Sequence, residues 1–215
     1  MKQFCLALMI ALLGTTSAYA VSLNWSSMSL NAGTNTSINF TAGTNFSVAL
    51  VFSANDLPSN TSKLLAISYA AKGASETYEQ TGVSLDVRTN GDVYGRGFGR
   101  ANDYKASPSI TFGTLTGTNV LGIAVTFATN STDSAKYDVT YTVYLNDTEV
   151  HTSTHSGVDN TADDFKYVRT GLNNTTLYYA TGTADGAAFA ALPEPTVLAL
   201  LALGVAGVAL RRKAA

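Results

Sequence analysis

The sequence is poor in cysteine, histidine, tryptophan and charge. Its single cysteine, Cys5, lies in an apolar run at the N-terminus, so the rest of the 215-residue chain has no thiol, no disulfide and no cysteine ligand for a metal. A Cys–His catalytic dyad is therefore excluded. Only 13% of the residues are charged, and Thr, Ser, Asn, Gly and Tyr are frequent. This composition is typical of an extracellular β-protein.

The N-terminus has the order of properties of a secretory signal peptide. Lys2 is followed by an unbroken apolar run, Phe4–Leu13, and then by small residues that end in Ala18-Tyr19-Ala20. This order predicts cleavage after Ala20, with Ala18 and Ala20 as the small residues before the cut. Residues 1–20 are thus predicted to be removed during export by the Sec machinery.

The C-terminus combines a short apolar segment with a basic cluster. Val197–Leu210 consists of fourteen apolar or glycine residues, and Arg211, Arg212 and Lys213 follow it. As a helix the run would be about 21 Å long, shorter than the hydrocarbon core of a bilayer. The basic cluster predicts that the last residues stay on the cytoplasmic side and the body outside.

The segment before this run completes a known pattern. Leu192-Pro193-Glu194-Pro195, the apolar run and the basic cluster together resemble a PEP-CTERM sorting signal, whose residues here are Pro193, Glu194, Pro195, Arg211, Arg212 and Lys213. The resemblance implies a Gram-negative bacterium, transient retention in the inner membrane, processing by an exosortase and an association with exopolysaccharide or biofilm. A permanent C-terminal anchor is the alternative.

The residues between the two ends, 21–192, form one domain's worth of chain. Removing Lys2, Arg211, Arg212 and Lys213 from the thirteen basic residues and Glu194 from the fifteen acidic ones leaves nine and fourteen, a net charge of −5. No basic block remains that would bind nucleic acid.

Strand patterns recur throughout this body. Tyr137–Leu145 alternates apolar and polar residues, and Phe46–Phe52 and Ile123–Phe127 are apolar on nearly every position. Asn90-Gly91 and Asn146-Asp147 predict type I′ hairpins. Further short runs rich in β-forming residues are Leu64–Tyr69, Val83–Val87, Ile110–Leu115 and Phe165–Leu172. The fold predicted is an all-β antiparallel sandwich or jelly roll over residues 21–180, followed by an Ala/Gly-rich linker, 181–192, and the sorting signal, 193–215.

The order of these strands resembles the concanavalin A-like, laminin G-type jelly roll. The resemblance rests on Phe46–Phe52 with Asn55-Asp56-Leu57, Lys63–Ile67, Gly82–Val87, Leu121–Phe127 and Val143–Val150. Because this fold serves many functions, the resemblance predicts architecture and leaves function to the site.

Catalytic and metal-binding patterns are missing from the body. Glycoside hydrolysis needs two paired carboxylates, but Glu76, Glu79 and Glu149 do not form the Glu-x-Asp-x-x-Glu pattern of the jelly-roll glycosidases. His151 and His155 follow a hairpin, where an extended chain would place them about 13 Å apart, too far to share one metal. The oxygen-rich stretch Asp159–Asp164 offers Ca²⁺ ligands, although a plain acidic loop is the simpler interpretation. No catalytic, metal or cofactor site is predicted.

One stretch is a candidate for glycan binding. In Asp92–Arg100 a strand would place Val93 and three glycines on one face and Tyr94, Arg96, Phe98 and Arg100 on the other. Aromatic rings stack on sugars, and guanidinium groups form bidentate bonds with carboxylates or sulfates. The alternative is a strand whose glycines allow close packing while the arginines are solvated.

The sequence therefore predicts an exported, exosortase-sorted protein of the cell surface or extracellular matrix that is non-catalytic and a candidate glycan binder. A jelly-roll carbohydrate-active enzyme and a protein–protein adhesin remain the alternatives.

Overall fold

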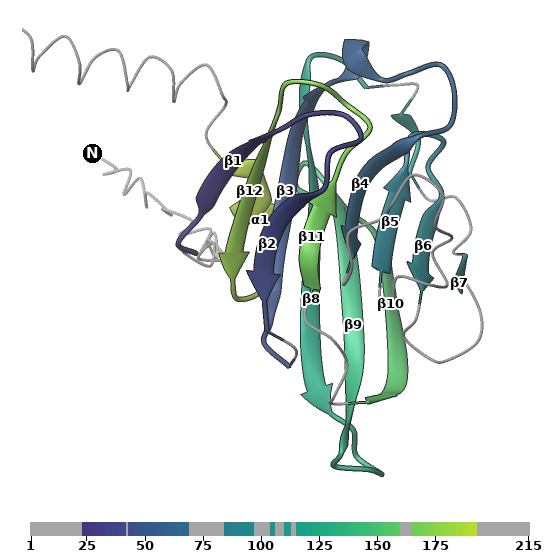
Figure 1. Cartoon of the computed structure of the whole chain (residues 1–215), viewed down its shortest axis with the longest axis vertical. Coiled ribbons are helices and arrows are strands. Elements are labelled where there is room, and N and C mark those ends of the chain that lie inside the picture. Colours follow the sequence, from purple (N-terminus) through teal and green to yellow (C-terminus); the bar gives the residue numbers. More distant parts are fainter. Residues whose placement is uncertain are drawn as a thin grey trace, which may run out of the picture.

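A computed structural model describes residues 23–41, 43–68, 84–96, 104–105, 110–112, 115–159 and 165–192 of the chain. Their strands form two antiparallel sheets, each of six strands. In Figure 1 the strand order of both sheets is followed from left to right. The first sheet has the order β1 (Ser26–Leu30), β12 (Thr175–Thr181), β3 (Phe46–Ser53), β8 (Thr118–Thr129), β9 (Lys136–Leu145), β10 (Thr148–Asp159). The second has the order β2 (Thr36–Phe40), β11 (Phe165–Arg169), β4 (Lys63–Ser68), β5 (Ser84–Arg88), β6 (Val93–Arg96), β7 (Tyr104–Lys105). The predicted all-β antiparallel sandwich is confirmed.

The main core lies between the two sheets. It follows from strand alternation, because successive side chains point to opposite faces. In β5, for example, Leu85 and Val87 are buried in this core, whereas Asp86 and Arg88 lie on the outer face of the second sheet. In β6 Val93 points into the core, so Tyr94 lies on the same outer face. The outer face of the second sheet is thus set by the sequence pattern.

Strand β3 is buried on both faces, as its apolar sequence predicts. Phe46, Val48 and Leu50 belong to the main core, while Ala49 and Val51 belong to a second apolar cluster on the outer face of the first sheet. Something must therefore cover the first sheet from outside.

The cover is the segment predicted to be a linker, and that prediction is wrong for its structured part. Residues Gly186–Ala190 form a short helix, α1, capped by Asp185, whose Oδ1 accepts a hydrogen bond from Ala188 N at 2.8 Å. Phe189 is completely buried and Leu192 nearly so. An Ala/Gly-rich stretch suggests a flexible linker, but here the small residues allow the chain to lie close against the sheet.

Both predicted hairpins exist, although neither has the predicted type I′ turn. At the β5–β6 turn, Gly91 N bonds to Arg88 O and Arg88 N bonds to Asp92 O, both at 2.9 Å, so the loop has three residues. Only Gly91 of the Asn90–Gly91 pair has a positive φ, 85°, whereas type I′ needs two. At the β9–β10 turn only Asn146 has a positive φ, 57°. Its side chain also accepts a hydrogen bond from Val120 N at 2.9 Å.

Two further differences concern strand assignments. Ile110 and Phe112 are buried core residues outside any strand, so the predicted strand Ile110–Leu115 is wrong in its described part. Strands β1, β2 and β12 were not expected. No helix in the described part of the chain is long and apolar enough to cross a bilayer. The predicted C-terminal helix, Val197–Leu210, and the signal peptide lie outside the described residues.

Candidate functional site

The two sheets differ sharply in charge. The strands of the first sheet contain one basic residue, Lys136, and three acidic residues, Asp138, Glu149 and Asp159. The strands of the second sheet contain one acidic residue, Asp86, and six basic residues: Lys63, Arg88, Arg96, Lys105, Lys166 and Arg169. The strands of the first sheet therefore have a net charge of −2 and those of the second sheet a net charge of +5, although the body as a whole is negatively charged.

Strand register determines how this charge is distributed over the outer face of the second sheet. One cross-strand row follows the paired residues from β2 to β6 and reads Ser37, Tyr167, Ser68, Ser84, Arg96. The next row runs from β11 to β7 and reads Arg169, Ala66, Asp86, Tyr94, Lys105. Neighbouring strands are about 4.8 Å apart, so each row extends over roughly 19 Å. Small residues on β4 thus separate Tyr167 and Arg169 from the arginines and tyrosine of β5 and β6.

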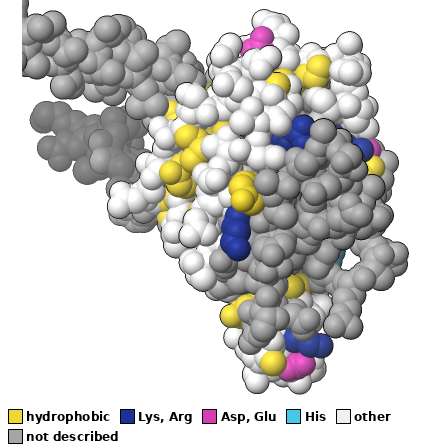
Figure 2. All heavy atoms as spheres, in the orientation of Figure 1, with side chains coloured by type: hydrophobic (Ala, Val, Ile, Leu, Met, Phe, Trp, Pro, Cys, Tyr) yellow, Lys and Arg dark blue, Asp and Glu magenta, His cyan; other side chains and the backbone are white. Residues whose placement is uncertain are grey.

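We call this surface the cationic face and define it by Lys63, Arg88, Tyr94, Tyr167 and Arg169. All five residues are half-buried. Figure 2 shows Lys and Arg side chains at several separate points on the side of the molecule that it views.

The best-defined contact on the cationic face is between Arg88 and Tyr94. The guanidinium carbon of Arg88 lies 4.2 Å from the centre of the Tyr94 ring, which is cation–π geometry. Tyr94 Oη donates a hydrogen bond to Asp92 Oδ2 at 3.3 Å, and Asn90 Nδ2 donates to the same oxygen at 3.1 Å. The ring is therefore held from two sides. A planar guanidinium fixed on an aromatic ring is preorganised to bind a carboxylate.

The one acidic residue on these strands is neutralised locally. Lys63 Nζ lies 3.1 Å from Asp86 Oδ2, and Asp86 is fully buried whereas the Lys63 side chain is 19% exposed. Among the residues that the structure describes, no carboxylate forms an ion pair with Arg88 or Arg169. These two arginines therefore keep their positive charge available.

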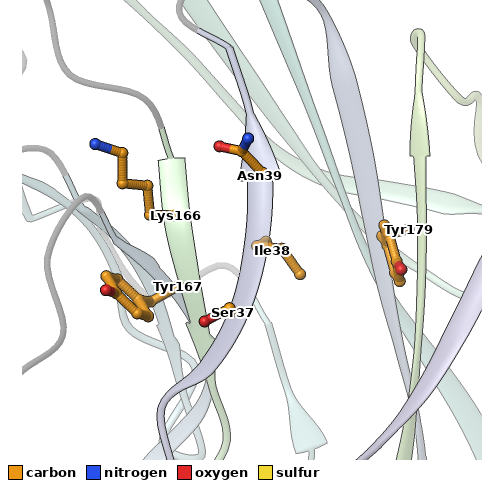
Figure 3. A pocket seen from close by; sticks show the side chains of 6 residues that line it. All are labelled: Ser37, Ile38, Asn39, Lys166, Tyr167 and Tyr179. Carbon is orange, nitrogen blue, oxygen red and sulfur yellow. The ribbon is translucent and has the colours of Figure 1, made fainter.

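A hollow of about 490 Å³ lies at the β2 end of the second sheet. Figure 3 shows Ser37, Asn39, Lys166 and Tyr167 on one side of β2, and Ile38 and Tyr179 on the other. Lys166 and Tyr167 are consecutive, yet they lie on the same side because the β11–β2 register shifts between Phe165 and Tyr167. Beside Tyr167, the hollow adds the amide of Asn39, the hydroxyl of Ser37 and the ammonium of Lys166 to the cationic face.

The predicted glycan-binding residues are only partly described. Tyr94 is on β6 and faces outward as expected, and Arg96 is the last residue of that strand, paired with Ser84 of β5. Phe98 and Arg100 lie outside the described residues. The sequence interpretation missed Arg88, Tyr167 and Arg169, which join Tyr94 only through sheet pairing. The alternation in Ser84–Arg88 was a usable signal for Arg88.

The two histidines are not part of the cationic face, because both lie on β10 of the first sheet and the cationic face belongs to the second sheet. Their rings flank Tyr141, each with its centroid 5.7 Å from the tyrosine centroid. Burial lowers the pKa of both imidazoles, and the nearby Glu149 carboxylate opposes this effect at His151. The chain between them is extended, as predicted, and its pairing with β9 is regular from His151 to His155. Their geometry is that of packed aromatic groups.

The other residues considered for chemistry add no described site. Glu76, Glu79 and residues 160–164 lie outside the described residues, and Glu149 is exposed on β10. In the described ranges, no group of three or more His, Cys, Asp or Glu residues is arranged to hold a metal ion.

Solved structures similar to this chain share little sequence with it. An alginate lyase, vAL-1 from Chlorella virus, matches with a TM-score of 0.43 at 11% identity, over 75% of this chain and 86% of that one. The galectin LEC-6 of Caenorhabditis elegans gives 0.38 at 7%, over 73% and 95%. The binding domain of Paraclostridial Mosquitocidal Protein 1 gives 0.36 at 14%, over 80% of this chain but only 45% of that one, so this chain spans less than half of its length. With TM-scores below 0.5, these likenesses carry no argument about function.

No curated protein sequence matches the chain. The PEP-CTERM protein-sorting motif matches residues 191–213, a range that contains Pro193–Pro195 and Arg211–Lys213. The first two matched residues, Ala191 and Leu192, belong to the folded body, since Ala191 caps α1 and Leu192 is buried. The chain therefore carries a PEP-CTERM sorting motif directly behind a β-sandwich body, and this motif implies an exported protein that an exosortase processes.

Proposed function

We propose that the body binds an acidic polysaccharide through its cationic face, and that the processed protein is a non-catalytic component of the cell surface or extracellular matrix. The observation that carries this proposal is the charge difference between the sheets, +5 against −2 on their strands. A body with a net charge of −5 repels a polyanion as a whole. Binding must then depend on a local positive surface, and the second sheet provides one.

The spacing of the groups supports a polymer rather than a small anion. Tyr94 and Tyr167 lie three strands apart, roughly 14 Å, and Arg88 and Arg169 lie two strands apart, roughly 10 Å. Two sugar units of a β-linked chain cover a similar length. The rings would stack on sugar faces while each guanidinium binds the carboxylate of an alternate uronate.

The sorting motif supports the setting of this binding. Retention in the inner membrane of a Gram-negative bacterium would be followed by exosortase cleavage, which delivers the body to a surface where such polysaccharides are present. The Sec machinery would export the precursor.

The test is calorimetric titration of the body with a polyuronate and with a neutral glucan. Arg88→Ala combined with Arg169→Ala is expected to weaken polyuronate binding about a hundredfold or more, since charge-assisted hydrogen bonds contribute about 1.5–3 kcal/mol each. Lys136→Ala is the matched control, because Lys136 lies on the first sheet and pairs with Asp133 on the exposed surface. Arg96→Ala with Arg100→Ala tests the arginines predicted from sequence.

Three results would contradict the proposal. Equal affinity for the neutral glucan would show that charge is irrelevant. A loss of binding free energy in the Lys136 control about half that of the double arginine variant would show that net charge alone matters, because the control removes one charge and the variant removes two. Scission of the polyuronate during incubation, measured by viscosity, would replace the binding function by an enzymatic one.

A further inference from the structure

The two ends of the body meet at one place. Leu23 and Trp25, at the start of the described chain, pack in the same outer cluster as Phe189 and Leu192, at its end. The rings of Trp25 and Phe189 have centroids 5.8 Å apart. Ala20, the predicted cleavage position, is three residues before Leu23, and the sorting motif continues directly after Leu192. We call the cluster of Leu23, Trp25, Phe189 and Leu192 the terminal pole.

The terminal pole and the cationic face lie on opposite sides of the sandwich. The pole covers the outer face of the first sheet, where Phe189 packs beside Gly122 of β8 and Tyr144 of β9. The cationic face is the outer face of the second sheet. One sheet-to-sheet spacing of about 10 Å and one helix-to-sheet spacing of similar size separate them, roughly 20 Å before side chains are counted.

The chain between the pole and the apolar run is short. Val197, the first residue of that run, is only five residues after the buried Leu192. Five extended residues reach about 17 Å at most. With α1 docked, this segment is too short to let the cationic face lie flat on the membrane that holds the apolar run.

We infer that, before exosortase processing, the body rests on the lipid surface by its terminal pole and presents its cationic face away from the membrane. Charge alone favours the opposite orientation, because anionic lipids attract basic surfaces and the pole lies near the acidic Asp147, Glu149 and Asp185. The docking of α1 therefore decides the orientation. The unprocessed protein keeps its positive surface free for a soluble polyanion. This inference rests on the proposed membrane retention and is independent of polysaccharide binding.

The test uses the full chain, produced with its signal peptide in a host without an exosortase and reconstituted in phosphatidylcholine vesicles, with and without phosphatidylglycerol. Removal of the signal peptide also removes Cys5, so Ala187→Cys and Asn39→Cys each introduce a single thiol for a fluorescent label. Ala187 is exposed on α1, and Asn39 is exposed on the outward side of β2. A nitroxide lipid is expected to quench the label at position 187 several-fold more than that at 39, in both lipid mixtures.

The docking requirement gives a second measurement. Phe189→Ala is expected to reduce the difference between the two labels, and to do so most in vesicles that contain phosphatidylglycerol. Equal quenching at both positions, stronger quenching at 39, or no quenching at either in chains that float with the vesicles would overturn the inference. Failure to float would instead contradict membrane retention, the part on which the inference rests.

Discussion

Phe189 occupies the space that a side chain at position 122 would need. A Cβ added to Gly122 would lie 2.6 Å from the Phe189 ring, closer than nonbonded carbon atoms can approach. The ring also contacts Trp25 and Tyr144, with centroids 5.8 and 5.2 Å away. A glycine inside the twelve-residue strand β8 is thus explained by a phenylalanine 67 positions later in the sequence. Residues up to Leu192 belong to the fold.

The first prediction concerns this pair. Gly122→Ala should destabilise the body by about 1–3 kcal/mol, because the extra methyl overpacks a filled site. Phe189→Ala should destabilise it by about 3–5 kcal/mol through the cavity that it leaves. In the double variant the alanine methyl no longer meets the ring. The loss of stability in the double variant should therefore be smaller than the sum of the losses in the two single variants. Urea unfolding of the four proteins measures this coupling, and strict additivity would show that the ring and Gly122 do not interact.

The second prediction concerns the ion pair beneath the cationic face. Lys63→Met removes the ammonium group that lies 3.1 Å from the fully buried Asp86 carboxylate, and breaking such a pair costs about 3–5 kcal/mol. Asp86→Asn in the Lys63→Met background should recover part of this loss because the buried negative charge is removed. Lys136→Met is the control on an exposed pair and should change the free energy of unfolding by less than about 1 kcal/mol. A loss no larger than that of the control would mean that solvent screens Asp86.

The sandwich could be predicted because its strands carry local signals. Phe46–Ser53 and Lys136–Leu145 match their predicted runs within a residue, since burial on two faces or on one leaves a direct trace in the sequence. Strand β1, with three serines in five residues, has no such trace and forms by pairing with β12. The helix α1 could not be predicted for a different reason. Phe189 is a single large apolar residue among alanines, and it becomes a core residue only because it packs against the first sheet.

The candidate site was predictable only along one strand. Tyr94 and Arg96 were proposed because alternation within a strand is readable, and the outward position of Tyr94 agrees with the register. Arg169 joins them through β11–β4 pairing, between segments about a hundred positions apart, which no local pattern encodes. Arg88 was within reach, because the predicted hairpin already placed β5 beside β6.

The third prediction is a loss of stability in mild acid. Burial lowers the pKa of His151 and His155 in the folded protein. In the unfolded chain the histidine pKa is about 6.5, so the unfolded chain binds protons before the folded protein does as the pH falls. The contribution of the two neutral histidines to the free energy of unfolding is therefore fully present above about pH 6.5. It decreases as the pH falls below this value, and the decrease ends below the pKa values of the histidines in the folded protein. Thermal melts at about pH 7.5 and about pH 5.5 should show a lower Tm at the acidic value.

Two variants separate the histidines from other titrating groups. His151→Gln with His155→Gln should flatten the decline over this range. Glu149→Gln should steepen it, because the Glu149 charge raises the pKa of His151. Asp138, whose pKa is lowered mainly by the Asn130 hydrogen bond, acts at lower pH, where its protonation removes stability. An unchanged slope in the double histidine variant would assign the effect elsewhere.

The fourth prediction distinguishes charge from geometry at Arg88. Arg88→Lys keeps the charge but loses the planar fork and much of the stacking on Tyr94, so polyuronate binding should weaken roughly two- to fivefold, equivalent to about 0.5–1 kcal/mol. Arg88→Ala should weaken it further and also reduce its sensitivity to salt, because one screened charge is gone. Titrations at two salt concentrations measure both effects. Equal affinities of the Lys and Ala variants would exclude a role for the charge.

The fifth prediction concerns where the mature chain ends. Exosortase processing should remove Thr196–Ala215, including Arg211–Lys213, because the two prolines of Pro193-Glu194-Pro195 disfavour helix and strand, which favours access by a protease. Phe189 and Leu192 are buried, so a cut before them would remove packed residues, whereas a cut after Leu192 leaves the fold complete. The intact mass of protein extracted from the surface of its native host should therefore correspond to a C-terminus at Pro195. A mass that retains the basic cluster would show a permanent anchor. A mass that ends before Phe189 would show that α1 is dispensable, and the urea-unfolding midpoint of that product would then match the uncut body.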